Sequence, residues 1–249
     1  MGLLSKDTFI CLDCESTGLD EENDRIIEIA AVKFTFDKHI EKKETLVNPE
    51  MPIPELSQSI HNISDEMVIG KPKIKEVLPE FLEFIDNHII VGHKIGFDLT
   101  LIHFEAERVG LTTNLRTTKY IDTLRLARLY GECPINSLEK LREHFNIPAE
   151  GAHRAMNDVV INIEVFKHLA SSFKTTESLM KRLEAPVKLK NMPLGKHKGR
   201  RFEEIPIEYL RWAANKDFDQ DLLFSIRSEL NNRKKGKSFE QSANPFSSL

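Results

Sequence analysis

Long apolar runs are missing from this sequence, and so are a dense set of cysteines and an excess of positive charge. No stretch stays apolar over the roughly 20 residues that a helix needs to cross a bilayer, and the N-terminus MGLLSKDTF has too few apolar residues for a secretory signal. The formal net charge is -4, which gives no overall attraction to nucleic acid or to an anionic membrane. We therefore expect no membrane partner, and any nucleic-acid binding must rest on local patches or on metal ions.

Cysteine occurs only at Cys11, Cys14 and Cys133, which form neither a disulfide framework nor a zinc-type cluster. A reducing, cytoplasmic setting is the expectation. Hydrophobic residues make up 40% and charged residues 30% of the 249 residues, as in an ordinary soluble globular protein. This length fits one large domain, or a medium domain with an appendage.

We expect the rest of the chain to be arranged around residues 9–19, FICLDCESTGL. The segment starts with apolar, strand-forming residues and ends in a Ser-Thr-Gly turn. Because successive side chains of a strand point to opposite faces, Asp13 and Glu15 share one face at the carboxyl end of a buried strand. Two such charges are costly unless a cation lies between them, and a hard divalent metal ion would meet that need. Acid-x-acid triplets are common by chance, so a solvated strand end is the alternative.

The remaining pattern predicts an α/β domain with a mixed sheet that is flanked by helices and ends near residue 174. A densely apolar strand is followed, after a turn at Asp37-Lys38, by an alternating strand that suits an outer position. Apolar residues at helical spacing then alternate with short apolar runs. The predicted strands are 25–36, 39–47, 89–91 and 120–122, and the predicted helices are 73–87, 97–109, 124–129, 138–145 and 158–173.

Two further acids lie close to the predicted core. Asp98 follows a strand, and Asp158 opens a helix whose next turn is apolar. Each has a histidine five residues before it, His93 and His153 respectively. Five helical residues turn through about 500°, so each histidine is expected in the loop before its helix rather than on the same face as the acid. Spacing does not distinguish the two histidines, and for either one a hydrogen-bonded loop residue is the plain alternative.

Four carboxylates and one histidine form a recognisable set for phosphodiester hydrolysis. Two divalent ions about 4 Å apart can hold the attacking water and the leaving oxygen, and carboxylates are their natural ligands. A histidine that titrates near neutrality can accept the proton of the water. Carboxylates in such a cluster repel one another, so metal binding also becomes part of the stability of the site.

Five segments in this order resemble the DEDDh branch of the DnaQ-like 3′-to-5′ exonucleases: DCESTG at 13–18, RIIEIAAVKF at 25–34, VGHKIGFDLTLI at 91–102, DTLRLAR at 122–128 and HRAMNDVVINIEVF at 153–166. The resemblance covers about residues 7–174. It implies an RNase H-like fold, with Asp13, Glu15, Asp98 and Asp158 as ligands of two Mg²⁺ or Mn²⁺ ions. It also implies that His153 is the general base.

The same resemblance implies a set of substrate-binding residues: Thr17, Gly18, Leu19, His61 and Phe97. Thr17 and Leu19 match positions at which the family touches and wedges the terminal nucleotides. His61 matches the histidine of an HGIT-like segment.

A second, smaller part is predicted after the exonuclease domain of residues 1–174. It comprises a helix and linker at 175–191, a small basic domain at 192–235 and a disordered tail at 236–249, since the chain is polar from residue 231 onward. The segment 192–201 holds four Lys or Arg, and an apolar pattern with the chain's only tryptophan, Trp212, follows it. This part is similar to a small domain, often of unassigned function, appended to some bacterial exonucleases. It could hold a nucleic-acid backbone or serve as a structural cap.

We therefore expect a metal-dependent 3′-to-5′ exonuclease acting on DNA in proofreading or repair, resembling the epsilon subunits of bacterial DNA polymerase III. An exoribonuclease is the first alternative, because nothing in the sequence reports a contact to a 2′-hydroxyl. A non-catalytic nucleic-acid-binding or scaffolding subunit is the second. The expected partners are single-stranded 3′ ends of DNA or RNA, a DNA polymerase, and a sliding clamp, since Gln241 to Phe246 resembles a Gln-x4-Phe clamp-binding peptide.

Overall fold

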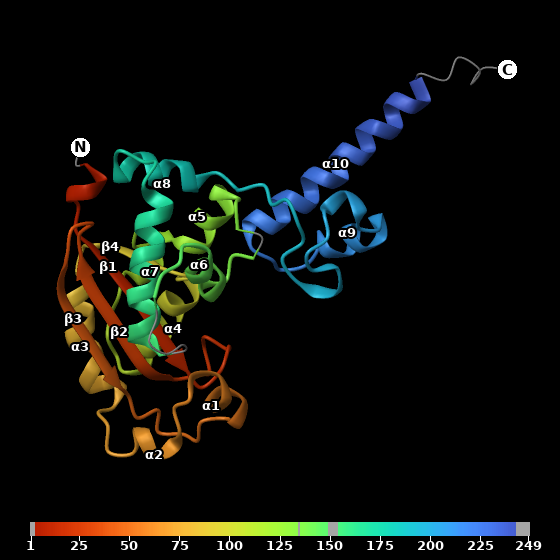
Figure 1. The fold of residues 1–249 in the computed structure, drawn as a ribbon. Helices are drawn as coiled ribbons and strands as arrows, with labels where there is room; N and C mark the ends of the chain where they lie inside the picture. Colours follow the sequence, from red (N-terminus) through yellow and green to blue (C-terminus); the bar gives the residue numbers. More distant parts are fainter. Residues whose placement is uncertain (1–2, 134, 149–153, 243–249) are drawn as a thin grey trace.

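A five-stranded sheet lies at the centre of the part of the chain that the computed structural model describes, which is residues 3–133, 135–148 and 154–242 (Figure 1). The strand order is β3-β2-β1-β4-β5, with antiparallel β1–β2 and β2–β3 pairs and parallel β1–β4 and β4–β5 pairs. The predicted mixed sheet is confirmed, and β3 lies at an edge as its alternating sequence indicates. The strands are β1 Phe9–Ser16, β2 Ile26–Phe34, β3 His39–Leu46, β4 Ile89–Gly92 and β5 Tyr120–Asp122.

Helices cover both faces of the sheet, and the helices predicted within the first 174 residues are present within a few residues of their expected bounds. The helix α1, directly after the proline-rich segment 48–54, was not predicted. In order, the α-helices of the described residues are α1 Glu55–His61, α2 Asp65–Val68, α3 Ile74–Ile85, α4 Gly96–Arg108, α5 Thr123–Tyr130, α6 Leu138–His144, α7 Ala155–Ala170, α8 Thr176–Glu184, α9 Ile207–Ala213 and α10 Gln220–Ser242.

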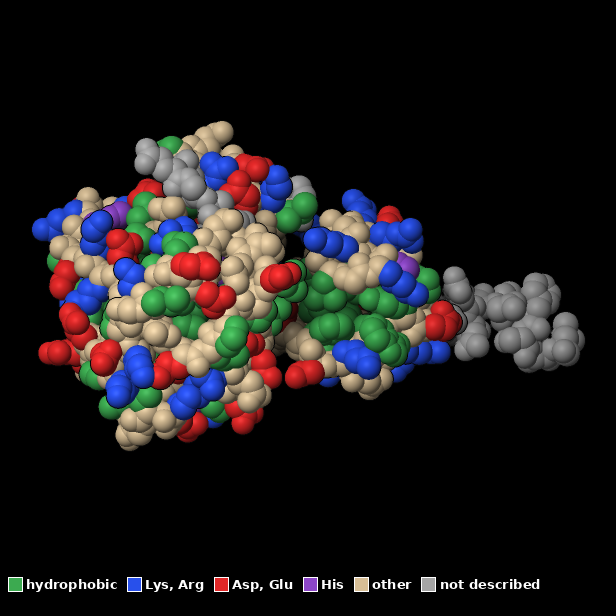
Figure 2. Space-filling model, turned by 90° about the horizontal axis from the view of Figure 1, so that it is seen from below, with side chains coloured by type: hydrophobic (Ala, Val, Ile, Leu, Met, Phe, Trp, Pro, Cys, Tyr) green, Lys and Arg blue, Asp and Glu red, His purple; other side chains and the backbone are tan. Residues whose placement is uncertain are grey.

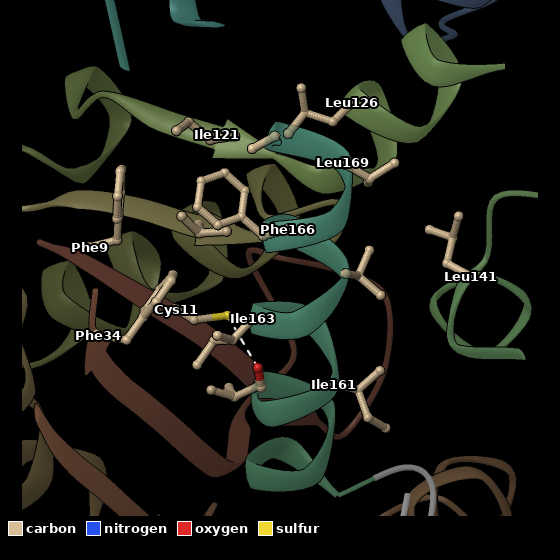
Figure 3. Packing of buried hydrophobic residues seen from close by; sticks show 14 of the residues in the cluster. Phe9, Cys11, Phe34, Ile121, Leu126, Leu141, Ile161, Ile163, Phe166 and Leu169 are labelled. Carbon is tan, nitrogen blue, oxygen red and sulfur yellow. Dashed lines mark hydrogen bonds between the residues drawn. The ribbon is translucent and has the colours of Figure 1, made fainter. Parts of the chain in front are cut away.

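The side chains of β1 alternate between two hydrophobic cores. Phe9 and Cys11 belong to the core under α7, whereas Ile10 and Leu12 belong to the core under α3 and α4. Figure 3 shows α7 lying on the first of these cores, where the rings of Phe9 and Phe166 meet edge to face at 5.3 Å. Each fully buried side chain of this size stabilises the fold by about 1.5–3 kcal/mol relative to an exposed position. The aromatic packing therefore holds α7 against β1.

The helix α7 begins at Ala155, three residues earlier than predicted, so Asp158 lies inside its first turn. The reason is a contact from another part of the chain. A carboxylate oxygen of Glu28, on β2, accepts a hydrogen bond of 2.9 Å from the Ala155 N–H and satisfies one of the free donors at the helix start. A cap supplied from 127 residues away is invisible to local sequence patterns.

The predicted disordered tail at 236–249 is wrong for residues 236–242, because α10 continues through Ser242 (Figure 1). The early turns of α10 are anchored by the buried side chains of Leu222 and Ile226. Half of the residues that follow in α10 are Arg, Lys, Glu or Gln, which are good helix formers and let the helix propagate once it is started. Residues 243–249 lie outside the described part of the chain.

The C-terminal unit, defined as residues 187–235, has a hydrophobic core of its own. Its buried residues are Leu189, Met192, Phe202, Ile205, Leu210, Ala213, Leu222 and Ile226.

In the part of the chain that the structure describes, no helix combines the length and the apolar character needed to cross a membrane.

Buried ion pairs join the C-terminal unit to α5. Asp221 is fully buried and accepts hydrogen bonds from Arg125 at 3.1 Å, from Arg128 at 3.0 Å and from the Val187 N–H at 2.9 Å. Arg128 also contacts Asp219, whose side chain is much more exposed. Asp221 thus balances two arginines at the junction, and removing it would leave buried charge without compensation.

We predict that Asp221→Ala lowers the free energy of unfolding by about 3–5 kcal/mol, the usual cost of breaking a buried ion pair from one side. Urea unfolding measures this effect. Asp219→Ala should cost much less, and Asp221→Asn should fall between the two because it keeps an acceptor for Val187. Equal stabilities for all three variants would contradict the assigned role of Asp221.

Candidate active site

The two acids of β1 face α7, as the alternation of the strand predicts. Asp13 and Glu15 continue the side of β1 that begins with Phe9 and Cys11, both buried under α7. The first turn of α7 brings Asp158 to the same place. Carboxylate oxygens of Asp13, Glu15 and Asp158 all lie within 4.8 Å of one another. A strand and a helix from opposite ends of the domain therefore meet at three acids.

Asp98 approaches from the other face of the sheet. It lies in the first turn of α4, is only 6% exposed, and its Oδ1 accepts a hydrogen bond of 2.9 Å from the N–H of Cys14, between the two acids of β1. Burial raises the pKa of Asp98 to about 7, although the bond from Cys14 opposes the rise. Asp98 is not one of the three acids that lie within 4.8 Å of one another, but its charge raises the pKa of Asp13.

Burial and mutual repulsion disfavour ionisation of these acids. Burial, followed by the charges of Asp98, Glu15 and Asp158, raises the pKa of Asp13 well above its usual range. Burial and then the charge of Asp158 raise the pKa of Glu15 to about 8. Carboxylate oxygens at this separation are the donors that a hard divalent cation takes, and a cation would remove the repulsion. The three acids therefore fit a divalent metal site.

Glu28 is a buried acid at this site that the sequence analysis missed. In the β1–β2 register it stands opposite Glu15. Its carboxylate accepts bonds of 2.5 and 3.1 Å from the Arg154 guanidinium, in addition to the bond from the Ala155 N–H. Arg154 in turn lowers the pKa of Glu15. One charged residue within the apolar run IIEIAAV of a central strand was the available signal.

The structure describes only one of the two histidines that spacing does not distinguish, His93. His153 lies outside the described residues, so its role as general base stays a prediction. His93 Nδ1 lies 3.1 Å from Thr123 Oγ1, which donates a bond of 2.6 Å to Asn162. Burial, followed by the charge of Lys94, lowers the pKa of His93 to about 4. His93 therefore belongs to an interior hydrogen-bond network.

That network continues to the strand that carries the acids. Asn162 donates to the sulfur of Cys11 at 3.5 Å, and Cys11 donates to the carbonyl of Val159 at 3.6 Å (Figure 3 shows the second bond). Asn162 lies one turn after Asp158 on α7, and Cys11 lies two residues before Asp13 on β1. These contacts connect the two elements directly beside the acids.

The expected substrate-binding residues lie in different environments. Thr17 is buried, and its hydroxyl donates to Asp24 at 2.7 Å and accepts from the Arg25 N–H at 2.9 Å. A Cβ at Gly18 would collide with a carboxylate oxygen of Asp24, so a larger residue there would displace the Asp24 side chain that accepts the bond from Thr17. Leu19 is 90% exposed just beyond this turn.

His61 and Phe97 are less exposed. His61 Nδ1 accepts a bond of 3.0 Å from the Ile63 N–H, and its buried Nε2 finds no hydrogen-bond partner among the described residues. Burial lowers the pKa of His61. The charge of Glu28 opposes this change, and the charge of Arg154 adds to it. Phe97 is half-buried against the core under α3 and α4.

Comparisons with known proteins identify the family of the chain. A family profile described as "Exonuclease" matches residues 10–166, a range that contains all four acids. The chain belongs to this exonuclease family. A second profile, described as "Putative quorum-sensing-regulated virulence factor", matches residues 181–225.

Relatives of the chain include DNA polymerase III proteins. The chain is 37% identical over 164 residues to the DNA polymerase III subunit epsilon of Aquifex aeolicus, covering 64% of this chain and 78% of that protein. It is 39% identical over 159 residues to the PolC-type DNA polymerase III of Caldanaerobacter subterraneus, covering 64% of this chain and 11% of the polymerase. The chain thus spans only about a tenth of that polymerase.

Solved exonuclease structures have the same fold. One is exonuclease X in complex with 5′ overhanging duplex DNA, with a TM-score of 0.56, 25% identity, and coverage of 71% of this chain and 99% of that chain. Another is Escherichia coli exonuclease I with a dA16 oligonucleotide, with a TM-score of 0.61, 19% identity, and coverage of 71% and 43%. These neighbours confirm the RNase H-like exonuclease fold.

Removing one acid should stabilise the metal-free protein at high pH. The folded-state pKa of Glu15 is raised from 4.5 to about 8, so this group opposes folding increasingly as the pH rises through that window. We predict that Glu15→Gln melts at nearly the same temperature as the unmodified protein near pH 4.5 and several degrees higher at pH 8.5. Thermal melting in EDTA provides the test. Saturating Mg²⁺ should remove the advantage, and the exposed control Glu41→Gln should show none.

Glu28 should act by positioning α7. We predict that Glu28→Gln keeps the fold but lowers exonuclease turnover by about 10- to 100-fold, because Arg154 and the start of α7 lose their charged anchor. Single-turnover cleavage with saturating substrate measures the effect. Glu44 also acts on Arg154 through its charge, so Glu44→Gln removes a nearby charge and is a matched control. Similar losses in both variants would mean that Glu28 matters only through its charge.

Proposed function

We propose that the chain is a divalent-metal-dependent exonuclease that removes nucleotides from the 3′ end of single-stranded DNA. The observation that carries this proposal is the meeting of Asp13, Glu15 and Asp158 within 4.8 Å, in a domain of the exonuclease family. Acids brought together this closely, at a cost to stability, fit a catalytic metal site better than a binding or scaffolding role.

Asp13, Glu15, Asp98 and Asp158 would hold two Mg²⁺ or Mn²⁺ ions. When bound, such ions neutralise the charge that develops on the phosphate and make a water molecule a better nucleophile. The residues of the chain set the site beforehand. The Cys14 N–H fixes the carboxylate of Asp98, and Glu28 fixes the start of α7 beside Asp158.

His153 is our candidate for the general base. It directly precedes Arg154, whose guanidinium Glu28 holds, so the chain enters α7 at an anchored point. A histidine titrating near neutral pH can take a proton from the attacking water. His93 is unsuited to this role, because its pKa of about 4 and its contact with Thr123 make it a neutral interior residue.

The terminal nucleotides would bind beside the turn that follows β1. Leu19 is exposed and can wedge between bases. The Nε2 of His61 is buried and finds no partner among the described residues, so a contact with a phosphate oxygen would require the side chains around it to open. Phe97 would support the base from the α4 side. Thr17 would act through the turn that it stabilises, because its hydroxyl already bonds to Asp24 and Arg25. Gly18 permits that turn.

DNA is the proposed substrate, because the relatives are DNA polymerase III proteins and the solved exonucleases X and I hold DNA. Proofreading or repair beside a DNA polymerase in the cytoplasm is the setting that we propose. Docking on a sliding clamp through Gln241 to Phe246 remains a proposal, since Phe246 lies outside the described residues. Gln241 lies in the last turns of α10, so docking as an extended peptide would require this end of the helix to unwind.

The substrate is tested with DNA and RNA oligonucleotides of matched sequence, labelled at either end. With Mg²⁺, we predict that 5′-labelled DNA yields a ladder of products and 3′-labelled DNA yields labelled mononucleotide at once. RNA should be cleaved more slowly. Faster cleavage of RNA would favour the exoribonuclease alternative, and mononucleotide released first from the 5′ label would contradict the polarity.

The catalytic assignment is tested by single substitutions. Asp13→Asn and Asp158→Asn should abolish cleavage while the fold is kept, since each removes a metal ligand. His153→Ala should lower turnover by about 10²- to 10⁴-fold, as loss of a general base does. His93→Ala is the matched control and should mainly lower stability. A larger loss of turnover in His93→Ala than in His153→Ala would reverse the assignment of the base.

A further inference from the structure

Two neighbouring aromatic rings lie on α9 of the C-terminal unit, the half-buried ring of Tyr209 and the exposed ring of Trp212. Tyr209 and Trp212 are one helical turn apart, with ring centroids separated by 5.2 Å. Trp212 is 51% exposed, although a core of buried apolar residues lies next to it. Leaving a large ring in water forgoes the free energy of burying it, so an exposed ring of this kind indicates a binding surface.

Lysines flank both rings. Lys196 Nζ lies 5.2 Å from the centroid of Tyr209, and Lys216 Nζ lies 5.0 Å from that of Trp212. The segment 188–217 carries eight Lys or Arg against four acids, in a chain with a net charge of -4. Figure 2 shows Lys and Arg side chains around hydrophobic side chains on this part of the molecule, to the right of the view. The local charge is therefore opposite to that of the whole chain.

The basic loop, defined as residues 192–201, is held against the rings. Its backbone closes on itself, because the Met192 N–H donates to the Arg200 carbonyl and the Gly199 N–H donates to the Met192 carbonyl, both at 2.8 Å. Gly195 has a φ of +70°, and a Cβ there would lie 2.8 Å from the Tyr209 hydroxyl. The loop and the rings thus form one preorganised surface, which lowers the entropic cost of binding a ligand.

We propose that this surface, formed by Lys196, Tyr209, Trp212 and Lys216, binds single-stranded DNA on the 5′ side of the end that is degraded. Unpaired bases stack on aromatic rings without regard to sequence, and ammonium groups pair with phosphates. An acidic peptide would satisfy the lysines but would leave the exposed ring without a stacking partner. The inference rests on the proposed exonuclease function, which supplies a single strand at this molecule.

Because the C-terminal unit is attached to the exonuclease domain, one strand can contact this surface and the active site at the same time. The bonds of Arg125 and Arg128 to Asp221 join α5 to α10 of the C-terminal unit. A strand bound at both places gains affinity because the second contact is intramolecular. The surface would therefore favour long strands over short ones without changing the cleavage step.

The chain's single tryptophan allows a direct test. The full-length protein in EDTA is titrated with a dT20 oligonucleotide, and tryptophan emission is followed beside the anisotropy of a labelled strand. Stacking on Trp212 should quench the emission with the same Kd that anisotropy gives. Unchanged emission while anisotropy shows saturation, or equal quenching by polyglutamate, would overturn the proposal.

Variants of the full-length protein separate stacking from charge. Trp212→Ala should weaken dT20 binding between about 5-fold and about 100-fold, the effect of losing one base stack. Phe224→Ala is the matched control, since Phe224 is 41% exposed on α10 of the same unit. Lys196→Ala with Lys216→Ala should lower the slope of log K against log salt by about 1 to 2, unlike Arg227→Ala. Unchanged affinity in Trp212→Ala, or an unchanged slope in the double variant, would overturn the proposal.

Cleavage of a trinucleotide distinguishes this inference from the proposed function. Such a substrate is too short to engage both places, so Trp212→Ala should cleave it at the unmodified rate. A reduced rate would mean that Trp212 contributes to the cleavage step itself, and it would contradict a separate binding surface. If the unmodified protein failed to cleave any strand, the proposed function would fail, and the inference, which rests on that function, would fail with it.

Discussion

The packing of α7 across β1 and β2 is the constraint on which the site depends. Burial of Phe9, Phe34 and Phe166 holds the helix on the sheet, and the bonds from Asn162 to Cys11 and from Cys11 to Val159 connect helix and strand. The same packing forces Asp158 toward the acids of β1. Since apolar burial is worth far more than the repulsion costs, the fold can hold acids together that would separate if free.

Charge at the site is then balanced in two ways. Glu28 and Arg154 form a permanent pair that fixes the start of α7. The charge of Glu28 raises the pKa of Glu15, and the charge of Arg154 lowers it. The charges of Asp13, Glu15 and Asp158 raise one another's energy, and a divalent cation would remove this repulsion. Stability is thus given up at the position where metal binding would restore it, which is common at catalytic sites.

Much of this could be predicted from the sequence, because it depends on local periodicity. The alternation in β1 predicted that Asp13 and Glu15 share a face, and apolar spacing predicted the helices that bring Asp98 and Asp158. Contacts between distant segments could not be predicted, such as the cap from Glu28 to Ala155. The helical structure of residues 236–242 was missed for a related reason. Tertiary packing nucleates α10 at its start, whereas a polar composition alone is typical of disorder.

The most direct test of the metal site is anomalous diffraction from crystals grown with Mn²⁺ and a deoxynucleoside monophosphate. We expect an anomalous peak within about 2.5 Å of carboxylate oxygens of Asp13, Glu15 and Asp158, the distance range of divalent cations bound by oxygen ligands. Loss of the peak in Asp13→Asn would support the same assignment. A fully occupied Mn²⁺ elsewhere, with these acids unligated, would contradict it.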